Sequence, residues 1–152
     1  MKKNIFCSII GCILFSSVAV AQSPAYDSLL AKKVGVDDYG MKQYVLVILT
    51  TGPSAITDKK IVDSLFKGHM ANMGVLAKDS RLVVAGPFGK NDMKYRGLFV
   101  FNTGSIEDAK AWVATDPAVK SGLLDAVYVK WYGSAALMLV NDAHEKVQKK
   151  SF

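Results

Sequence analysis

The chain of 152 residues contains two histidines, His69 and His144, whose imidazoles are the side chains best suited to proton transfer near neutral pH. Around His69, apolar residues recur at helical spacing, and Thr57 or Asp58 can cap a helix that runs to about residue 78. On a helical wheel His69 falls inside the apolar stripe, so it points toward the protein interior. Two interpretations stay open: a core histidine with a satisfied hydrogen bond, or an imidazole in a cleft that acts as acid or base. The stripe consists of Ile61, Val62, Leu65, Phe66, Met70, Met73 and Leu76.

Asp116 is the carboxylate that could serve such an imidazole. It precedes Pro117, and aspartate before proline is typical of a helix start, where the carboxylate caps backbone N–H groups. The other interpretation is that Asp116 orients an imidazole, as the acid does in a His–Asp pair. The sequence by itself does not bring Asp116 beside His69, so both roles stay open.

Gly86 and Pro87 follow an apolar segment and predict a strand end at which a ligand can approach the backbone. Glycine permits close approach because it has no β-carbon. We predict that Gly86 and Pro87 line a ligand-binding pocket, and a simple turn is the alternative.

Neither a metal site nor a cofactor is predicted. His144 lies in a polar C-terminal stretch far from His69, where we expect it to be solvated, and two distant histidines do not make a metal site. The two cysteines, Cys7 and Cys12, both lie in the first 21 residues.

Those 21 residues have the three-part pattern of a secretory signal peptide. Lys2 and Lys3 precede an apolar stretch at residues 5–15, and residues 19–21 (Ala-Val-Ala) are typical of a cleavage site. A weaker, lipoprotein-like pattern ends at Cys12. Cleavage after Ala21 predicts a cysteine-free chain exported to the periplasm or outside the cell, with no membrane anchor. The predicted organisation is a signal peptide (1–21), a lead-in segment (22–41), one domain (42–133) and a C-terminal extension (134–152).

Four apolar segments predict β-strands, at residues 44–49, 81–85, 97–101 and 126–132. The helix that carries His69 lies between the first two, and a second helix, which Ser105 opens in capping-box style, lies between the last two. This β-α-β-β-α-β order is typical of a ferredoxin-like α+β fold, an antiparallel sheet with both helices on one face. Residues 26–33 predict a short helix, residues 135–140 are expected to extend the sheet, and residues 141–150 predict a helical tail.

The strand at residues 44–49 is apolar on both faces, although the two helices cover only one face of the sheet. A large exposed apolar face is unusual on a soluble monomer, so we predict a homodimer packed sheet to sheet. On the last strand Tyr128 and Lys130 share one face and Val129 and Trp131 the other. Core and dimer packing are favoured there over base stacking, and a formal charge of +6 spread over scattered lysines does not predict a nucleic-acid partner.

Several motifs, in this order, resemble the YCII-related (YciI-like) domain family. They are the helix histidine His69, the sequence VVAGP at residues 83–87, SIEDAKAW at 105–112, DPAV at 116–119 and VYVKW at 127–131. The resemblance covers about residues 44–132. It implies a ferredoxin-like domain that pairs as a dimeric α+β barrel, with a site built around His69 and Asp116. The signal peptide, the lead-in and the C-terminal extension depart from the family's usual cytoplasmic form.

Two functions are consistent with these observations. The first is a small exported enzyme in which His69 transfers a proton and Asp116 orients it, acting on a small molecule. The alternative is a non-catalytic dimeric module that binds a ligand or serves an accessory role.

Overall fold

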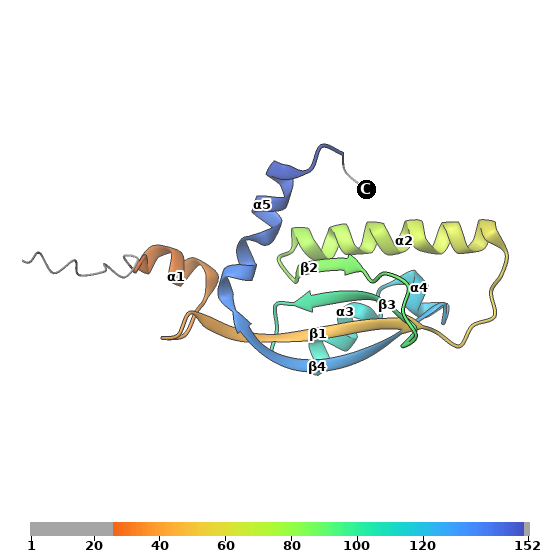
Figure 1. Ribbon diagram of the computed structural model, residues 1–152, viewed down its shortest axis with the longest axis horizontal. Helices are drawn as coiled ribbons and strands as arrows, with labels where there is room; N and C mark the ends of the chain where they lie inside the picture. Colours follow the sequence, from red (N-terminus) through yellow and green to blue (C-terminus); the bar gives the residue numbers. More distant parts are fainter. Residues whose placement is uncertain (1–25, 151–152) are drawn as a thin grey trace, which may run out of the picture.

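The computed structural model describes residues 26–150, so the predicted signal peptide and its cleavage site lie outside the described residues. No helix in the described part of the chain combines the length and the apolar character that a membrane span requires. Figure 1 shows the elements in space. In chain order they are α1 (Ser28–Val34), β1 (Met41–Thr51), α2 (Lys59–Lys78), β2 (Leu82–Pro87), β3 (Tyr95–Phe101), α3 (Ile106–Val113), α4 (Pro117–Lys120), β4 (Leu124–Ser134), the 3₁₀ helix η1 (Ala135–Leu139) and α5 (Val140–Val147).

The four strands form one antiparallel sheet in the order β2-β3-β1-β4. The central strand β1 pairs with β4 over its full length, from Met41 opposite Ser134 to Thr51 opposite Leu124. The predicted ferredoxin-like α+β fold is thereby confirmed. One boundary differs from prediction, because β2 continues through Gly86 and Pro87, which pair with β3, instead of stopping before them.

Helices α2 and α3 begin where side-chain caps were predicted. The Asp58 carboxylate accepts hydrogen bonds from the backbone N–H groups of Lys60 and Ile61, at 2.8 and 3.1 Å, and so starts α2. The Ser105 hydroxyl accepts one from the N–H of Asp108 at 3.1 Å and starts α3. Each cap supplies an acceptor to N–H groups that have no partner within the helix.

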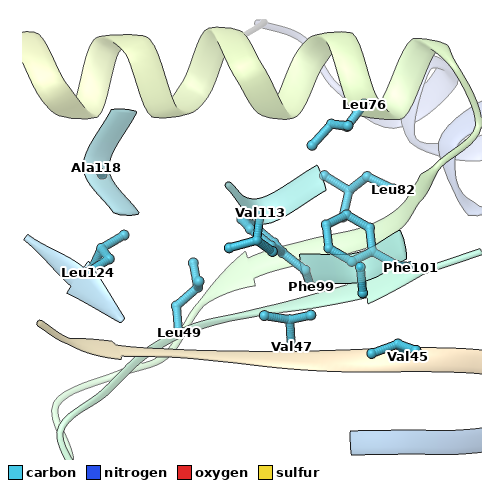
Figure 2. Packing of buried hydrophobic residues seen from close by; sticks show 11 residues of the cluster. Val45, Val47, Leu49, Leu76, Leu82, Phe99, Phe101, Val113, Ala118 and Leu124 are labelled. Atoms are coloured by element: carbon cyan, nitrogen blue, oxygen red, sulfur yellow. The ribbon is translucent and has the colours of Figure 1, made fainter. Parts of the chain in front are cut away.

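The core lies between the sheet and the helices. Side chains at alternate positions of β1, namely Val45, Val47 and Leu49, point toward the helical layer, and Figure 2 shows Leu76 of α2 approaching them from the opposite side. Phe99 and Phe101 of β3 lie in the same layer (Figure 2). This burial fixes the register of the sheet, because a slip of one residue would turn the apolar set to the other face.

The second face of the sheet is covered only in part. At one end Leu137 and Met138 of η1 pack against Tyr44, Val83 and Val100. Beyond η1, three apolar side chains of β4 on this face stay exposed, with 49% of Val127, 45% of Val129 and 37% of Trp131 accessible. The structure contains one chain, and the homodimer stays a prediction.

Residues 135–139 do not extend the sheet, which corrects the sequence-based expectation. They form η1, in which the Ser134 hydroxyl accepts a hydrogen bond from the N–H of Ala136 at 3.3 Å and Ala135 is fully buried. The Ala135 N–H bonds to the Gly40 carbonyl at 3.0 Å, next to the last β1–β4 pair, and from there the chain enters η1 and leaves the sheet. This turn carries the chain over the open face and up to α5.

The lead-in and the C-terminal extension meet at one end of the molecule. Helix α1 contacts η1, and Lys33 of α1 forms an ion pair with Asp142 of α5 at 3.5 Å. The Asn141 side-chain amide donates a hydrogen bond to the carbonyl of Leu82, at 2.9 Å, and so ties α5 to the edge strand β2. Figure 1 shows α5 standing beside β2 and the C-terminal end of α2.

Candidate active site

His69 lies on the inner side of α2, and only 8% of the residue is exposed. Its ring stacks on Phe99 of β3, with centroids 5.8 Å apart and an angle of 23° between the ring planes. The ring of Phe66, one turn earlier on α2, meets it edge-on at 5.9 Å. The imidazole is therefore held between two aromatic side chains in the layer between helix and sheet.

Asp116 is fully buried, and its two carboxylate oxygens have different partners. Oδ2 lies 2.5 Å from Nδ1 of His69. Oδ1 accepts a hydrogen bond from the N–H of Ala118 at 2.8 Å and caps α4. The two interpretations of Asp116 are thus compatible, since one residue makes both contacts. An ionised carboxylate can only accept, so Nδ1 is assigned as the donor of this hydrogen bond, and in the neutral imidazole Nε2 then presents a lone pair.

Nε2 is the atom of this pair that remains available. It makes no hydrogen bond to any residue from 26 to 150. In the same part of the chain, no buried side-chain nitrogen or oxygen is left without a partner. Nε2 therefore keeps some contact with solvent, through the 10% of the His69 side chain that is exposed.

The close approach of α4 to α2 brings the pair together. Gly68 faces Pro117 directly, and a β-carbon on Gly68 would lie 2.9 Å from the proline Cγ. Any larger residue at this position would push the start of α4 away from α2, because the proline ring cannot fold aside. Gly68 and Pro117 adjoin His69 and Asp116 in sequence, so their contact sets the spacing of the pair.

A second polar contact ties the same elements together. The Thr115 hydroxyl lies 2.9 Å from the side-chain oxygen of Asn72 on α2 and 2.7 Å from the Trp112 carbonyl, and either oxygen can accept its single hydrogen. Sequence reasoning missed Asn72 and Thr115. The available signal was their position, because Asn72 lies one turn after His69 and Thr115 directly precedes Asp116.

Gly86 and Pro87 lie exposed at the end of β2, opposite Leu98 and Gly97. They follow Ala85, which pairs with Phe99, the residue on which His69 stacks. No described hydrogen bond joins either of them to the His–Asp pair. Their role in ligand binding stays a prediction.

No group of three metal-ligating side chains occurs among the described residues. His144 is exposed on α5, on an element other than the one that carries the His–Asp pair. Tyr128 of β4 packs against the core, where burial and, to a lesser extent, the nearby Asp125 raise the pKa of its phenol.

Comparison with known proteins gives a family match over the sheet and its helices. Residues 43–132 match the profile of the YCII-related domain. No curated protein matches the chain. Among solved structures, the chain is similar to 5-chloro-2-hydroxyhydroquinone dehydrochlorinase (TftG) from Burkholderia phenoliruptrix AC1100, in complex with 2,5-dihydroxybenzoquinone. The two are 20% identical over 58% of this chain and 92% of that chain, with a TM-score of 0.43.

Proposed function

The chain belongs to the YCII-related family, and from that premise we propose that it is a small-molecule enzyme in which Nε2 of His69 transfers a proton while Asp116 holds the ring. The observation that carries the proposal is the buried contact of 2.5 Å between His69 Nδ1 and Asp116 Oδ2. Because Nδ1 is engaged in this contact, Nε2 is the nitrogen that we assign to contact a reactant.

The surroundings of the ring support acid–base chemistry. When Nε2 accepts a proton, the imidazolium lies beside the Asp116 carboxylate, and a charge-assisted hydrogen bond stabilises it. Asp116 is itself fixed by the N–H of Ala118, so the carboxylate does not need to reorganise during the reaction. Because only a tenth of the His69 side chain is accessible, the reacting group must be small.

A chemical probe tests whether Nε2 is available. Diethyl pyrocarbonate acylates accessible imidazole nitrogens, and peptide mass spectrometry locates the modified histidine. We expect both His69 and the exposed His144 to be acylated in the folded protein, and His144 serves as the internal control. Acylation of His144 alone, with His69 reacting only after denaturation, would favour the non-catalytic binding module.

A second experiment tests proton transfer itself. Small carbonyl compounds are incubated with the protein in D2O, and exchange of carbon-bound hydrogen for deuterium is followed by NMR. For a compound that exchanges, we expect His69→Gln to lower the rate by about 10²–10⁴-fold, the usual contribution of a general base. An unchanged rate in a folded His69→Gln variant would remove His69 from the mechanism.

We also propose export, on the signal-peptide pattern of residues 1–21. The expected mature chain begins at Gln22. Its mass after expression in a bacterium with a periplasm, together with its fractionation, checks this. A chain that keeps Met1 and stays in the cytoplasm would contradict it.

A further inference from the structure

A groove separate from the His–Asp pair lies between α2, β2 and α5. It encloses about 820 Å³, within the usual size range of small-molecule sites. Its floor is apolar and includes Met70 and Met73 of α2 and Leu82 and Val84 of β2. His69 and Asp116 do not line it.

Met70 shows that this side of α2 faces the groove and not the core. The helical wheel placed Met70 in the core stripe, but 38% of the residue is exposed, and it lines the groove. Methionine side chains are flexible and polarizable, so they adapt to ligands of irregular shape. An exposed, concave apolar surface of this kind is typical of a binding site.

The C-terminal extension builds the other wall. Val140, Asn141 and His144 of α5 line the groove, and α5 is held there by the bond from Asn141 to the Leu82 carbonyl. The family match ends at residue 132, so this wall lies outside the matched domain. The groove is thus a feature that the extension adds to the YCII-related domain.

The ionisable side chains that line the groove are both basic. Lys67 and His144 are the ionisable residues that line it, and neither forms an ion pair with a described residue. Asn141 and Gln148 add amide donors. Acidic side chains, Asp142 and Glu145, line only the neighbouring hollow, which also contains Lys78. An anionic group is therefore favoured beside Lys67.

We propose that this groove binds an amphipathic monocarboxylate, with its alkyl chain on the methionine-lined floor and its carboxylate beside Lys67. The apolar floor provides the burial, and the unpaired cation provides the preference for a charged end. The proposal does not depend on the chemistry of His69.

Calorimetry with alkyl carboxylates of increasing length tests the proposal. From octanoate to dodecanoate, each added methylene should lower Kd about fourfold until the groove is full. Dodecanol should bind about five- to tenfold more weakly than dodecanoate, and Lys67→Met should remove that difference. The matched control is Lys60→Met, a lysine on the same helix that does not line the groove. Equal binding of dodecanoate and dodecanol, or no binding of either, would overturn the proposal.

Gly74 allows the location to be tested without loss of the fold. It lines the groove, and a β-carbon there meets no atom within 4 Å. Gly74→Leu should therefore fold and fill the groove, with at least a tenfold loss of dodecanoate binding, whereas Val75→Leu, at the next position, which is 60% exposed and does not line the groove, should bind normally. Unchanged binding to Gly74→Leu would place the ligand elsewhere. A change of oligomeric state in Gly74→Leu would instead identify the groove as a contact between copies, and would also overturn the proposal.

Discussion

At the scale of single residues, Asp116 has two tasks that are usually assigned to different side chains. Its Oδ1 starts α4, and its Oδ2 holds His69. A carboxylate in a fully buried position is costly unless hydrogen bonds satisfy it, and these two contacts do so. The cap and the candidate site therefore depend on one another.

Substitution of Asp116 separates the two tasks. Asparagine is as good an N-cap as aspartate, so Asp116→Asn should keep α4 and change the free energy of unfolding by about 1 kcal/mol or less. Its carbonyl can accept from Ala118, which turns the amide N–H toward Nδ1 and forces the proton to Nε2. Urea denaturation and 15N NMR of the imidazole should therefore record a stable protein with the opposite tautomer and reduced proton transfer.

Asp116→Ala is the comparison for that variant. It removes the cap and leaves the buried Nδ1 without a partner, so we expect a loss of about 2–4 kcal/mol. Equal destabilisation by alanine and asparagine would show that the carboxylate charge, rather than the cap, sets the stability.

At the scale of elements, α2 is in contact with different neighbours on its two sides. One side meets α4 at Gly68, and the other borders the groove at Gly74. The helix thus positions the His–Asp pair and forms a wall of the separate groove. Two glycines in one helix interior also provide a matched pair for mutation.

Alanine at these two positions should have different effects. Gly74→Ala should stabilise the protein by about 0.5–1 kcal/mol, because alanine favours the helix and the added methyl meets open space. Gly68→Ala gains the same propensity but forces Pro117 aside, so it should be less stable than Gly74→Ala and lengthen the His69–Asp116 contact. Thermal unfolding and a crystal structure measure the two effects. Equal stabilisation by both changes would show that the approach of α4 is not tight.

The hydrogen bond from the Tyr132 hydroxyl to Asp37 joins β4 to the turn before β1 and makes stability depend on pH. It lowers the pKa of Asp37 from its ordinary value of 3.8. It also raises the pKa of Tyr132 above its ordinary value of 10.0. The ionised carboxylate contributes to the free energy of unfolding above pH 3.8, and this contribution is lost as the pH falls through the folded-state pKa of Asp37. The protonated phenol contributes to the free energy of unfolding below pH 10.0, and this contribution is lost as the pH rises through the folded-state pKa of Tyr132.

Tyr132→Phe should therefore lower the Tm between about pH 4 and pH 10, and the difference from the native chain should shrink toward both extremes. Melting curves across this range measure it. Tyr39→Phe is the control, because Tyr39 is 87% exposed and its hydroxyl bonds to no described residue. A difference that stays constant below pH 3.8 would show that Asp37 is not the group involved.

The sequence predicted those parts of the fold that short-range patterns encode. Short apolar segments predicted the four strands, helical periodicity predicted the helix that carries His69, and Asp58, Ser105 and Asp116 predicted the helix starts. The sequence did not predict the turn at Ala135 or the exposure of Met70. The turn and the exposure of Met70 both depend on where the C-terminal extension packs on the domain. Contacts between segments far apart in the sequence decide that position, such as the hydrogen bond from Asn141 to the Leu82 carbonyl.

The candidate site was predictable only in part for the same reason. A helical wheel turns His69 inward, but no local pattern measures its distance from Asp116. That distance follows from the packing of α4 on α2 at Gly68, a contact between segments far apart in the sequence. The residues were identified from their types, and their pairing required the fold.

At the scale of the whole molecule, the segments beyond the matched domain gather at one end. Helix α1, η1 and α5 contact one another or the sheet there, joined by Lys33 with Asp142 and by Asn141 with Leu82. They cover part of the sheet's open face and form a wall of the groove. The rest of that face, on β4, keeps Val127, Val129 and Trp131 exposed in the single chain.

We expect a second copy of the chain to cover it. Val127, Val129 and Trp131 form an exposed apolar stripe on β4, next to Leu46 and Ile48 of β1. A stable interface buries about 800 Å² on each partner, an area for which a sheet face is suited.

Sedimentation of the native chain at micromolar concentration should give a dimer. Val129→Lys places a charge in the centre of the stripe and should raise the dimer Kd at least about 100-fold, while the monomer stays folded because the position is 45% exposed. The control is Val75→Lys on α2, which is 60% exposed and lies across the molecule from this face. A native chain that sediments as a monomer, or a Val129→Lys variant that dimerises as well as Val75→Lys, would rule out this face as the interface.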